Sequence, residues 1–169
     1  FSSTPNGLRS GAVLGLSSRK INAQAALYPF ELIQRYVERI GISLDLMTVV
    51  VMGVAFKGRP ETTDIRGSVA IDLLNVLKER VGKVIGWDAI IEPTELESIG
   101  FETTNDLRSA IEASDVVLIL NNHPENVRSE LYCQPPKQRL LFDGWNQLDV
   151  IEVEKISGLS YATMGYMTQ

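Results

Sequence analysis

The stretch VVVMGVAFKGRPETTDIRGS, Val49 to Ser68, decides the fold of this chain. It opens with a continuous apolar run rich in β-branched residues, which is typical of a central strand covered on both faces of a sheet. Gly53 then leaves room for a close backbone approach after the strand. The following loop contains no Gly-x-Gly-x-x-Gly, and Arg59-Pro60 stands where a P-loop has Lys-Ser or Lys-Thr. A buried strand therefore leads into a loop that lacks both of these phosphate-binding signatures.

That loop combines an aromatic ring with charged and hydroxyl side chains. Phe56 can stack on a flat base or a sugar, and Lys57 is a compact cation for a phosphate or carboxylate. Residues 62–64 are candidate caps for a helix with Arg66 near its start, where an anion is favoured. Singly, Phe56 is also compatible with the core, Lys57 with solvent, and Asp64–Arg66 with a surface pair worth under about 1 kcal/mol. The ordered combination favours a ligand-binding loop.

Short apolar runs and amphipathic segments alternate along the rest of the chain. Further strands are expected within 83–88, 116–121 and 138–144, with a weak edge strand within 158–165. Helices are expected within 64–82, ended by Gly82, and within 92–100, with Pro93 in the first turn. Two more are expected at 105–115, capped by Asn105, and at 123–131, started by Pro124.

Strands separated by helices at this spacing predict βαβ units and a parallel sheet. With right-handed crossovers, the expected fold is a Rossmann-like, doubly wound α/β domain with three layers, α/β/α. A helix with apolar residues at helical spacing is expected before it, over residues 20–40. Pro29 predicts a break, a kink or a helix start at that point, and Gly41 a stop.

Length and composition limit the class of protein. The 169 residues indicate one domain, and the net charge of −5 argues against a general nucleic-acid binder. No apolar run approaches the length of about 18 residues that spans a membrane. The single cysteine, Cys133, excludes an internal disulfide and suits a reducing cytoplasm. Residues 1–18 are expected to be a flexible lead-in, and a start at Phe1 suggests a piece of a longer polypeptide.

Ligands of open parallel sheets bind beyond the carboxyl ends of the strands. Three such ends carry polar and aromatic residues: the loop after the first strand, the segment NNHPE at 121–125 and the segment DGWN at 143–146. Their convergence predicts a ligand crevice at one edge of the sheet.

The segment GVAFKGRPETTDIRGS resembles the signature that opens the C-terminal, UDP-binding domain of the UDP-glucose/GDP-mannose dehydrogenase family. That signature reads Gly-Leu-Ala-Phe-Lys, a short polar turn, and Asp-x-Arg-x-Ser. The segments VIGWDA, ASDVVLILNNHPE and LLFDGWN resemble later family motifs, and SRKIN with FELI resembles the helix that enters the domain. The resemblance covers residues 18–165. It implies a linker helix from a central dimerisation region over 19–46 and a UDP-binding domain over 47–165.

The resemblance also implies an activity. Family members oxidise C6 of a nucleotide sugar to the uronate with NAD, in the cytoplasm, as homodimers, for polysaccharide precursors. A cysteine nucleophile lies in their N-terminal catalytic half, and the C-terminal domain closes over the UDP-sugar. By this resemblance Phe56 and Lys57 contact the substrate, and Arg66 reaches the NAD side of the cleft. No nucleic-acid or membrane partner is implied.

The chain departs from the family pattern at several positions. The turn between Lys57 and Asp64 is about two residues longer, and Ala89 replaces the usual proline. Trp145 replaces an arginine that many members direct at the substrate. Its ring could stack where the arginine made hydrogen bonds, so Trp145 is a candidate substrate residue. The turn variant FKGRPET and Trp145 hint at an N-acetylhexosamine substrate.

A catalytic role within this chain is not expected. Cys133 lacks the glycine-flanked context of the family nucleophile, and His123 is a lone loop histidine before proline. The isolated chain is therefore expected to be inactive. The alternative is a stand-alone Rossmann-like module that binds a nucleotide or regulates without turnover. A phosphoacceptor receiver domain is excluded, because no acidic pair follows the first strand to hold magnesium.

Overall fold

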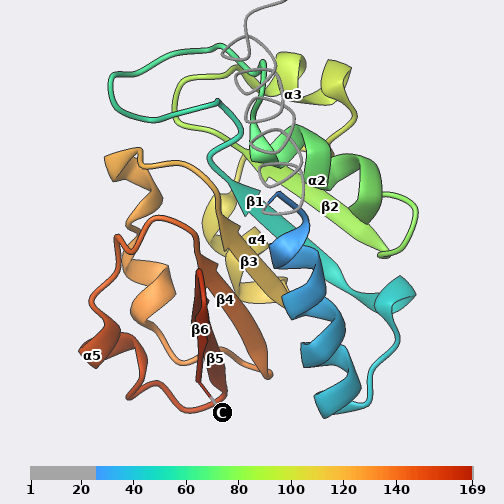
Figure 1. Ribbon diagram of the computed structural model, residues 1–169, viewed down its shortest axis with the longest axis vertical. Coiled ribbons are helices and arrows are strands. Elements are labelled where there is room, and N and C mark those ends of the chain that lie inside the picture. The colour runs from blue at the N-terminus through green and yellow to red at the C-terminus, as the bar shows by residue number, and fades with distance from the viewer. Residues whose placement is uncertain (1–25, 169) are drawn as a thin grey trace, which may run out of the picture.

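The structure, a computed structural model, describes residues 26–168. Its centre is a six-stranded sheet with the order β2-β1-β3-β4-β5-β6 (Figure 1). The first five strands are mutually parallel and β6 runs antiparallel to β5. Their bounds are β1 Thr48–Met52, β2 Lys83–Trp87, β3 Val116–Ile119, β4 Arg139–Asp143, β5 Leu159–Thr163 and β6 Tyr166–Met167.

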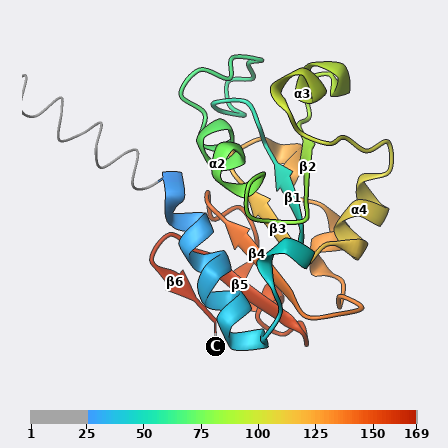
Figure 2. The same cartoon turned by 90° about the vertical axis from the view of Figure 1, so that its right-hand side faces the viewer.

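The two faces of the sheet are covered by different helices, because side chains of a strand alternate between its faces. Val49 and Val51 pack in one core with the helix described over 26–40 and with α2 (Val69–Leu77). Val50 and Met52 pack in the other core with α4 (Leu107–Ala113) and α5 (Val150–Val153). Figure 2 shows the sheet between these layers. The predicted three-layer α/β/α fold is confirmed.

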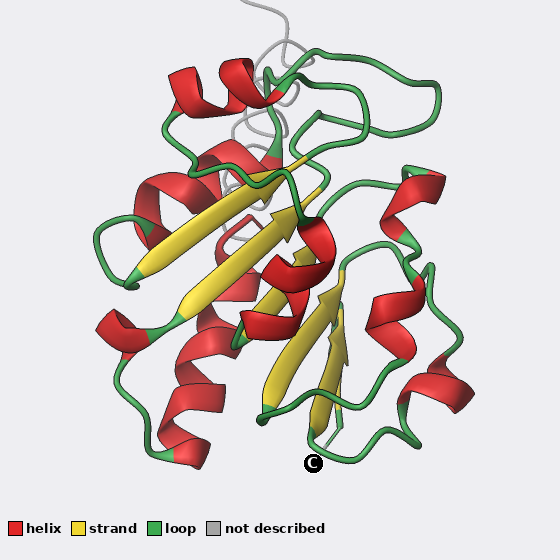
Figure 3. Cartoon of the chain, turned by 180° about the vertical axis from the view of Figure 1, so that it is seen from behind, coloured by secondary structure: helices red, strands yellow, loops and turns green. Residues whose placement is uncertain are grey.

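The strand order creates a crevice at the carboxyl edge of the sheet. From β1 the chain crosses through α2 to β2 on one side, and then returns past β1, through α3 (Pro93–Ile99) and α4, to β3 on the other side. Connections that leave neighbouring strands in opposite directions open a topological switch point, which is where doubly wound sheets bind ligands. Figure 3 shows the strand ends and their loops at this edge.

Two helix starts differ from the prediction. Ser68, and not residues 62–64, caps α2: its hydroxyl accepts a hydrogen bond from the Ala70 N–H at 3.2 Å. Asp106, and not Asn105, caps α4, because its carboxylate accepts from Ser109 N at 3.0 Å. The prediction for α3 is confirmed, with Pro93 in its first turn and Gly100 ending it at φ 110°.

Other elements also depart from the sequence pattern. The helix described over 26–40 shows no break at Pro29, while the alternative of a helix start near Pro29 stays untested, because residues 1–25 lie outside the described residues. Helix α2 ends at Leu77, before Gly82. Residues 123–131 form two 3-10 turns, η2 (Pro124–Asn126) and η3 (Ser129–Tyr132), in place of the expected helix. The strand expected at the edge, β5, lies inside the sheet because β6 pairs outside it. The short elements η1 (Leu44–Leu46) and α5 were not predicted.

The predicted lead-in, residues 1–18, and the start of the linker helix lie outside the described residues. None of the helices described within 26–168 combines the length and the apolar composition needed to cross a membrane.

Candidate functional site at the carboxyl edge of the sheet

The start of the loop after β1 is held by a buried carboxylate that follows β2. Asp88 accepts hydrogen bonds from the backbone N–H groups of Val54 at 2.7 Å and Ala55 at 2.9 Å. Its other oxygen accepts from Ile90 at 2.9 Å and Ile91 at 3.2 Å. Hydrogen bonds to an ionised acceptor are the stronger kind, and here they satisfy buried backbone donors. The loop therefore leaves β1 in a fixed direction, directly before the aromatic residue and the lysine.

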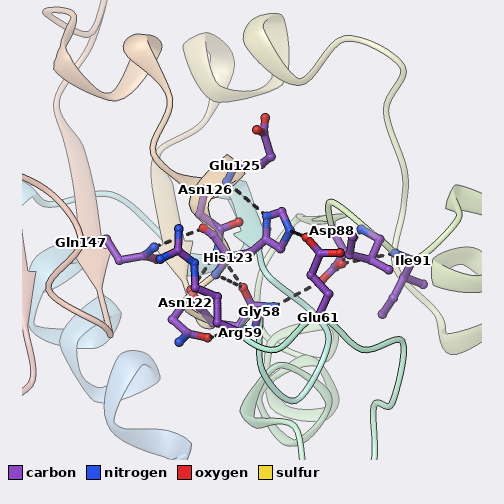
Figure 4. Close-up of polar contacts among 12 residues, drawn as sticks. Gly58, Arg59, Glu61, Asp88, Ile91, Asn122, His123, Glu125, Asn126 and Gln147 are labelled. Atoms are coloured by element: carbon purple, nitrogen blue, oxygen red, sulfur yellow. Dashed lines mark hydrogen bonds and ion pairs between the residues drawn. The ribbon is translucent and has the colours of Figure 1, made fainter.

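The middle of the same loop is held by the loop after β3, as Figure 4 shows. Asn122 Oδ1 accepts hydrogen bonds from the backbone N–H groups of Gly58 at 2.9 Å and Arg59 at 3.0 Å. A Cβ atom on Gly58 would lie only 2.1 Å from the backbone nitrogen of His123, so the close approach requires glycine. We call this contact the Asn122 clamp.

His123 adds a second connection between the two loops. Its Nδ1 accepts a hydrogen bond from Glu125 N at 3.1 Å, which leaves Nε2 to carry a proton toward Glu61 Oε1 at 3.2 Å. The imidazole is buried and caps η2, so its visible role is to position the loop. That His123 is not a catalytic base stays a prediction.

The loop after β4 joins the same assembly. Gln147 Nε2 donates to His123 O at 3.1 Å, and Trp145 Nε1 donates to Leu120 O at 3.0 Å. The buried Asp143 carboxylate fixes the turn by accepting from Trp145 N at 3.1 Å. Tyr161 packs beside it, and burial, reinforced by Asp143, raises the pKa of the Tyr161 hydroxyl. Three loops far apart in the sequence thus form one fixed edge.

The residues predicted to contact substrate lie on two of these loops. Phe56 is 53% exposed, so the alternative that it belongs to the core is wrong. Its ring faces Gly67, where an added Cβ would be 3.9 Å from the ring carbons. Lys57 is half-buried on the same loop, and Trp145 is 47% exposed on the loop after β4. No hydrogen bond connects these three side chains to one another within residues 26–168.

Arg66 lies in the turn before α2 and not inside the helix, in contrast to the prediction. Its side chain is 89% exposed and binds the Asp64 carboxylate through Nη2 at 2.7 Å and Nε at 2.9 Å. These hydrogen bonds lower the pKa of Asp64 to about 2. The pair leaves one edge of the Arg66 guanidinium open to solvent.

Trp145 also borders an apolar cavity of about 140 Å³, close to the size of one aromatic ring. The cavity is lined by Pro29, Val69, Leu120, Phe142, Gly144, Trp145 and Met164. The indole is held in place by its hydrogen bond to Leu120 O. A flat or small apolar group of a ligand fits this cavity.

Cys133 is exposed in the segment after η3, where its thiol donates a hydrogen bond to Ser129 O at 3.5 Å. This segment lies outside the three loops of the carboxyl edge. Within residues 26–168, no cluster of three or more His, Cys, Asp or Glu side chains is arranged to hold a metal ion.

Comparison with known proteins identifies the family of this chain. The model of the UDP binding domain of the UDP-glucose/GDP-mannose dehydrogenase family matches residues 50–150. The UDP-glucose 6-dehydrogenase TuaD of Bacillus subtilis is 32% identical over 161 residues, which cover 85% of this chain and 34% of the relative. A UDP-N-acetyl-D-mannosamine dehydrogenase of Pyrococcus horikoshii is 24% identical over 131 residues, covering 76% and 29%.

Solved structures support the fold. The structure of the UDP-D-ManNAc dehydrogenase from Pyrococcus horikoshii superimposes with a TM-score of 0.68 at 22% identity, over 87% of this chain and 32% of that one. The chain spans about a third of the length of the curated relatives it matches. The matched segment begins within β1 and includes all three loops of the carboxyl edge. The match of residues 50–150 to the UDP binding domain and the identity to TuaD show that the chain belongs to the UDP-glucose/GDP-mannose dehydrogenase family.

Proposed function

We propose that this chain is the nucleotide-sugar-binding part of an NAD-dependent UDP-sugar 6-dehydrogenase. The whole enzyme would oxidise a UDP-hexose or UDP-N-acetylhexosamine to the uronate, in the cytoplasm, for polysaccharide precursors. The match of the family's UDP binding domain to residues 50–150 carries this proposal. In this assignment residues 47–165 bind the UDP-sugar, and the helix within 19–46 connects them to the dimerisation region of a homodimer.

The geometry supports specific roles for the predicted residues. The Lys57 ammonium group provides a positive charge for the diphosphate, at the switch point where doubly wound sheets bind ligands. The exposed faces of Phe56 and Trp145 offer stacking surfaces for the base or the sugar. Asp88 and the Asn122 clamp hold the loop before a ligand arrives, which reduces the entropy lost on binding.

Arg66 is the residue of this chain that we propose as a contact of the cofactor. Arg66 has guanidinium N–H groups that remain available beside the Asp64 pair, and they fit an anionic or hydroxyl group of NAD. The loop after β1 contains no Gly-x-Gly-x-x-Gly, so we place the main NAD site and the nucleophilic cysteine in the N-terminal catalytic half. When bound, NAD would supply the hydride acceptor, and this chain would orient the UDP-sugar.

A kinetic test of the full-length protein addresses the proposal. We expect NADH formation with a UDP-sugar, and the longer loop and Trp145 favour an N-acetylhexosamine over glucose. Lys57→Ala should lower kcat/KM at unchanged thermal stability, whereas Lys78→Ala, at the exposed end of α2, should behave as wild type. Binding of UDP by the full-length protein without NAD reduction for any UDP-sugar would instead favour a stand-alone binding or regulatory module.

A further inference from the structure

We infer that Arg59 is a second cation that contacts the diphosphate of the nucleotide sugar, a role that rests on the proposed function. Arg59 lies within the turn that is longer here than in the common family pattern, two residues after Lys57 in the sequence. Its backbone is held by the Asn122 clamp, and its side chain has no carboxylate partner among residues 26–168.

The backbone at Arg59 is fixed although its side chain is exposed. The Asn122 clamp binds the backbone N–H groups of both Gly58 and Arg59, and the glycine is pressed against the backbone of His123. Figure 4 shows the Arg59 side chain extending toward Gln147, on the loop that also carries Trp145. Arg59 therefore reaches from the loop of Lys57 toward the loop of Trp145, across the carboxyl edge where the ligand is proposed to bind.

The charges of the loop leave this guanidinium available for an anion. The Glu61 carboxylate accepts a hydrogen bond from His123, and Asp64 forms an ion pair with Arg66. Within residues 26–168 no carboxylate lies within ion-pair distance of Lys57 or Arg59, and residues 1–25 contain no Asp or Glu.

A guanidinium and an ammonium group on one fixed loop suit a diphosphate. Guanidinium groups bind phosphate oxygens through two parallel hydrogen bonds, whereas an ammonium group acts as a point charge. The two side chains would therefore contact different oxygens of the same ligand. Replacing only one of them should weaken binding of the phosphates without removing it.

The test uses the full-length protein, with UDP as the probe. Arg59→Gln should raise the inhibition constant of UDP and the KM of the UDP-sugar by about tenfold or more. The kcat, the KM of NAD and the melting temperature should remain at wild-type values. Arg59→Lys should recover part of the loss. Arg80→Gln, which removes an exposed positive charge after α2, should change none of these quantities.

A second variant tests the clamp. Asn122→Ala frees the backbone of Arg59, so it should also raise the inhibition constant of UDP. Added to Arg59→Gln, it should raise that constant by a smaller factor than it does in the wild-type background, because part of its effect acts through Arg59.

Three results would overturn the inference. An inhibition constant of UDP within twofold of wild type in Arg59→Gln would show that Arg59 makes no phosphate contact. A parallel rise in the KM of NAD, or a lower melting temperature, would show a structural effect. If the wild-type protein neither binds UDP nor reduces NAD with any UDP-sugar, the proposed function fails together with this inference; activity with an unaffected Arg59→Gln refutes the inference alone.

Discussion

Asp88→Asn is expected to destabilise the domain more than any exposed acidic substitution. The carboxylate accepts hydrogen bonds from four backbone N–H groups. One oxygen binds those of Val54 and Ala55, and the other binds those of Ile90 and Ile91. An asparagine has one oxygen, so in either orientation its amide NH₂ faces two N–H groups that lose their acceptor. Each buried unsatisfied donor costs about 1–3 kcal/mol, and the total loss is therefore about 2–6 kcal/mol. Domains are stable by only about 5–15 kcal/mol, so the loss is large.

Urea denaturation of the 169-residue chain, followed by circular dichroism, measures this loss by linear extrapolation. The matched control is Asp72→Asn, an exposed carboxylate in the first turn of α2, which should change the free energy of unfolding by about 0.5 kcal/mol or less. A loss below about 1 kcal/mol in Asp88→Asn would refute the reasoning, because it would mean that these backbone donors do not depend on the carboxylate.

Three further predictions follow from the structure. Gly58→Ala should cost about 1–3 kcal/mol in urea denaturation and raise the KM of the UDP-sugar, because the new Cβ collides with the backbone of His123; wild-type values for both would contradict this. UDP should quench the tryptophan fluorescence of the wild-type protein and of Trp87→Phe, because the Trp145 ring is expected to stack on the ligand. Trp145→Phe should show no quenching, and a retained response in this variant would exclude the ring from the site. Burial, reinforced by Asp115, raises the pKa of Tyr36 to about 12 from 10.0. The stability that neutral Tyr36 contributes is therefore complete below pH 10, and about 2–3 kcal/mol of it is lost as the pH rises toward 12. Alkaline denaturation followed by circular dichroism measures this loss, and Tyr36→Phe should remove it.

Much of the fold could be predicted from the sequence because burial on both faces leaves a clear pattern. The run from Val49 to Met52 is apolar at every position, and both sets of alternate residues are indeed buried. Helix starts were harder, because neighbouring residues compete as caps. Asn105 and Asp106 are both good caps by type, and only the position of the Ser109 N–H decides for Asp106.

The candidate site was predictable in part. Residues on the loop after β1, Phe56 and Lys57 among them, stand out by their order in the sequence. The segments that contain Asp88 and Asn122, VIGWDA and NNHPE, were noted in the sequence, but the roles of the two side chains were missed, because both act on backbone groups far away along the chain. The position of each residue, within a few positions of the end of a buried strand, indicates a place at the carboxyl edge but not the backbone groups that it binds.

The Asn122 clamp has a consequence for how this surface can change. It binds the backbone of residue 59 and leaves the side chain out of the interaction. The side chain at this position can therefore change without removing the hydrogen bond that holds the loop. A protein engineer could thus vary residue 59 alone to change the affinity for the diphosphate, while the framework that supports it stays folded.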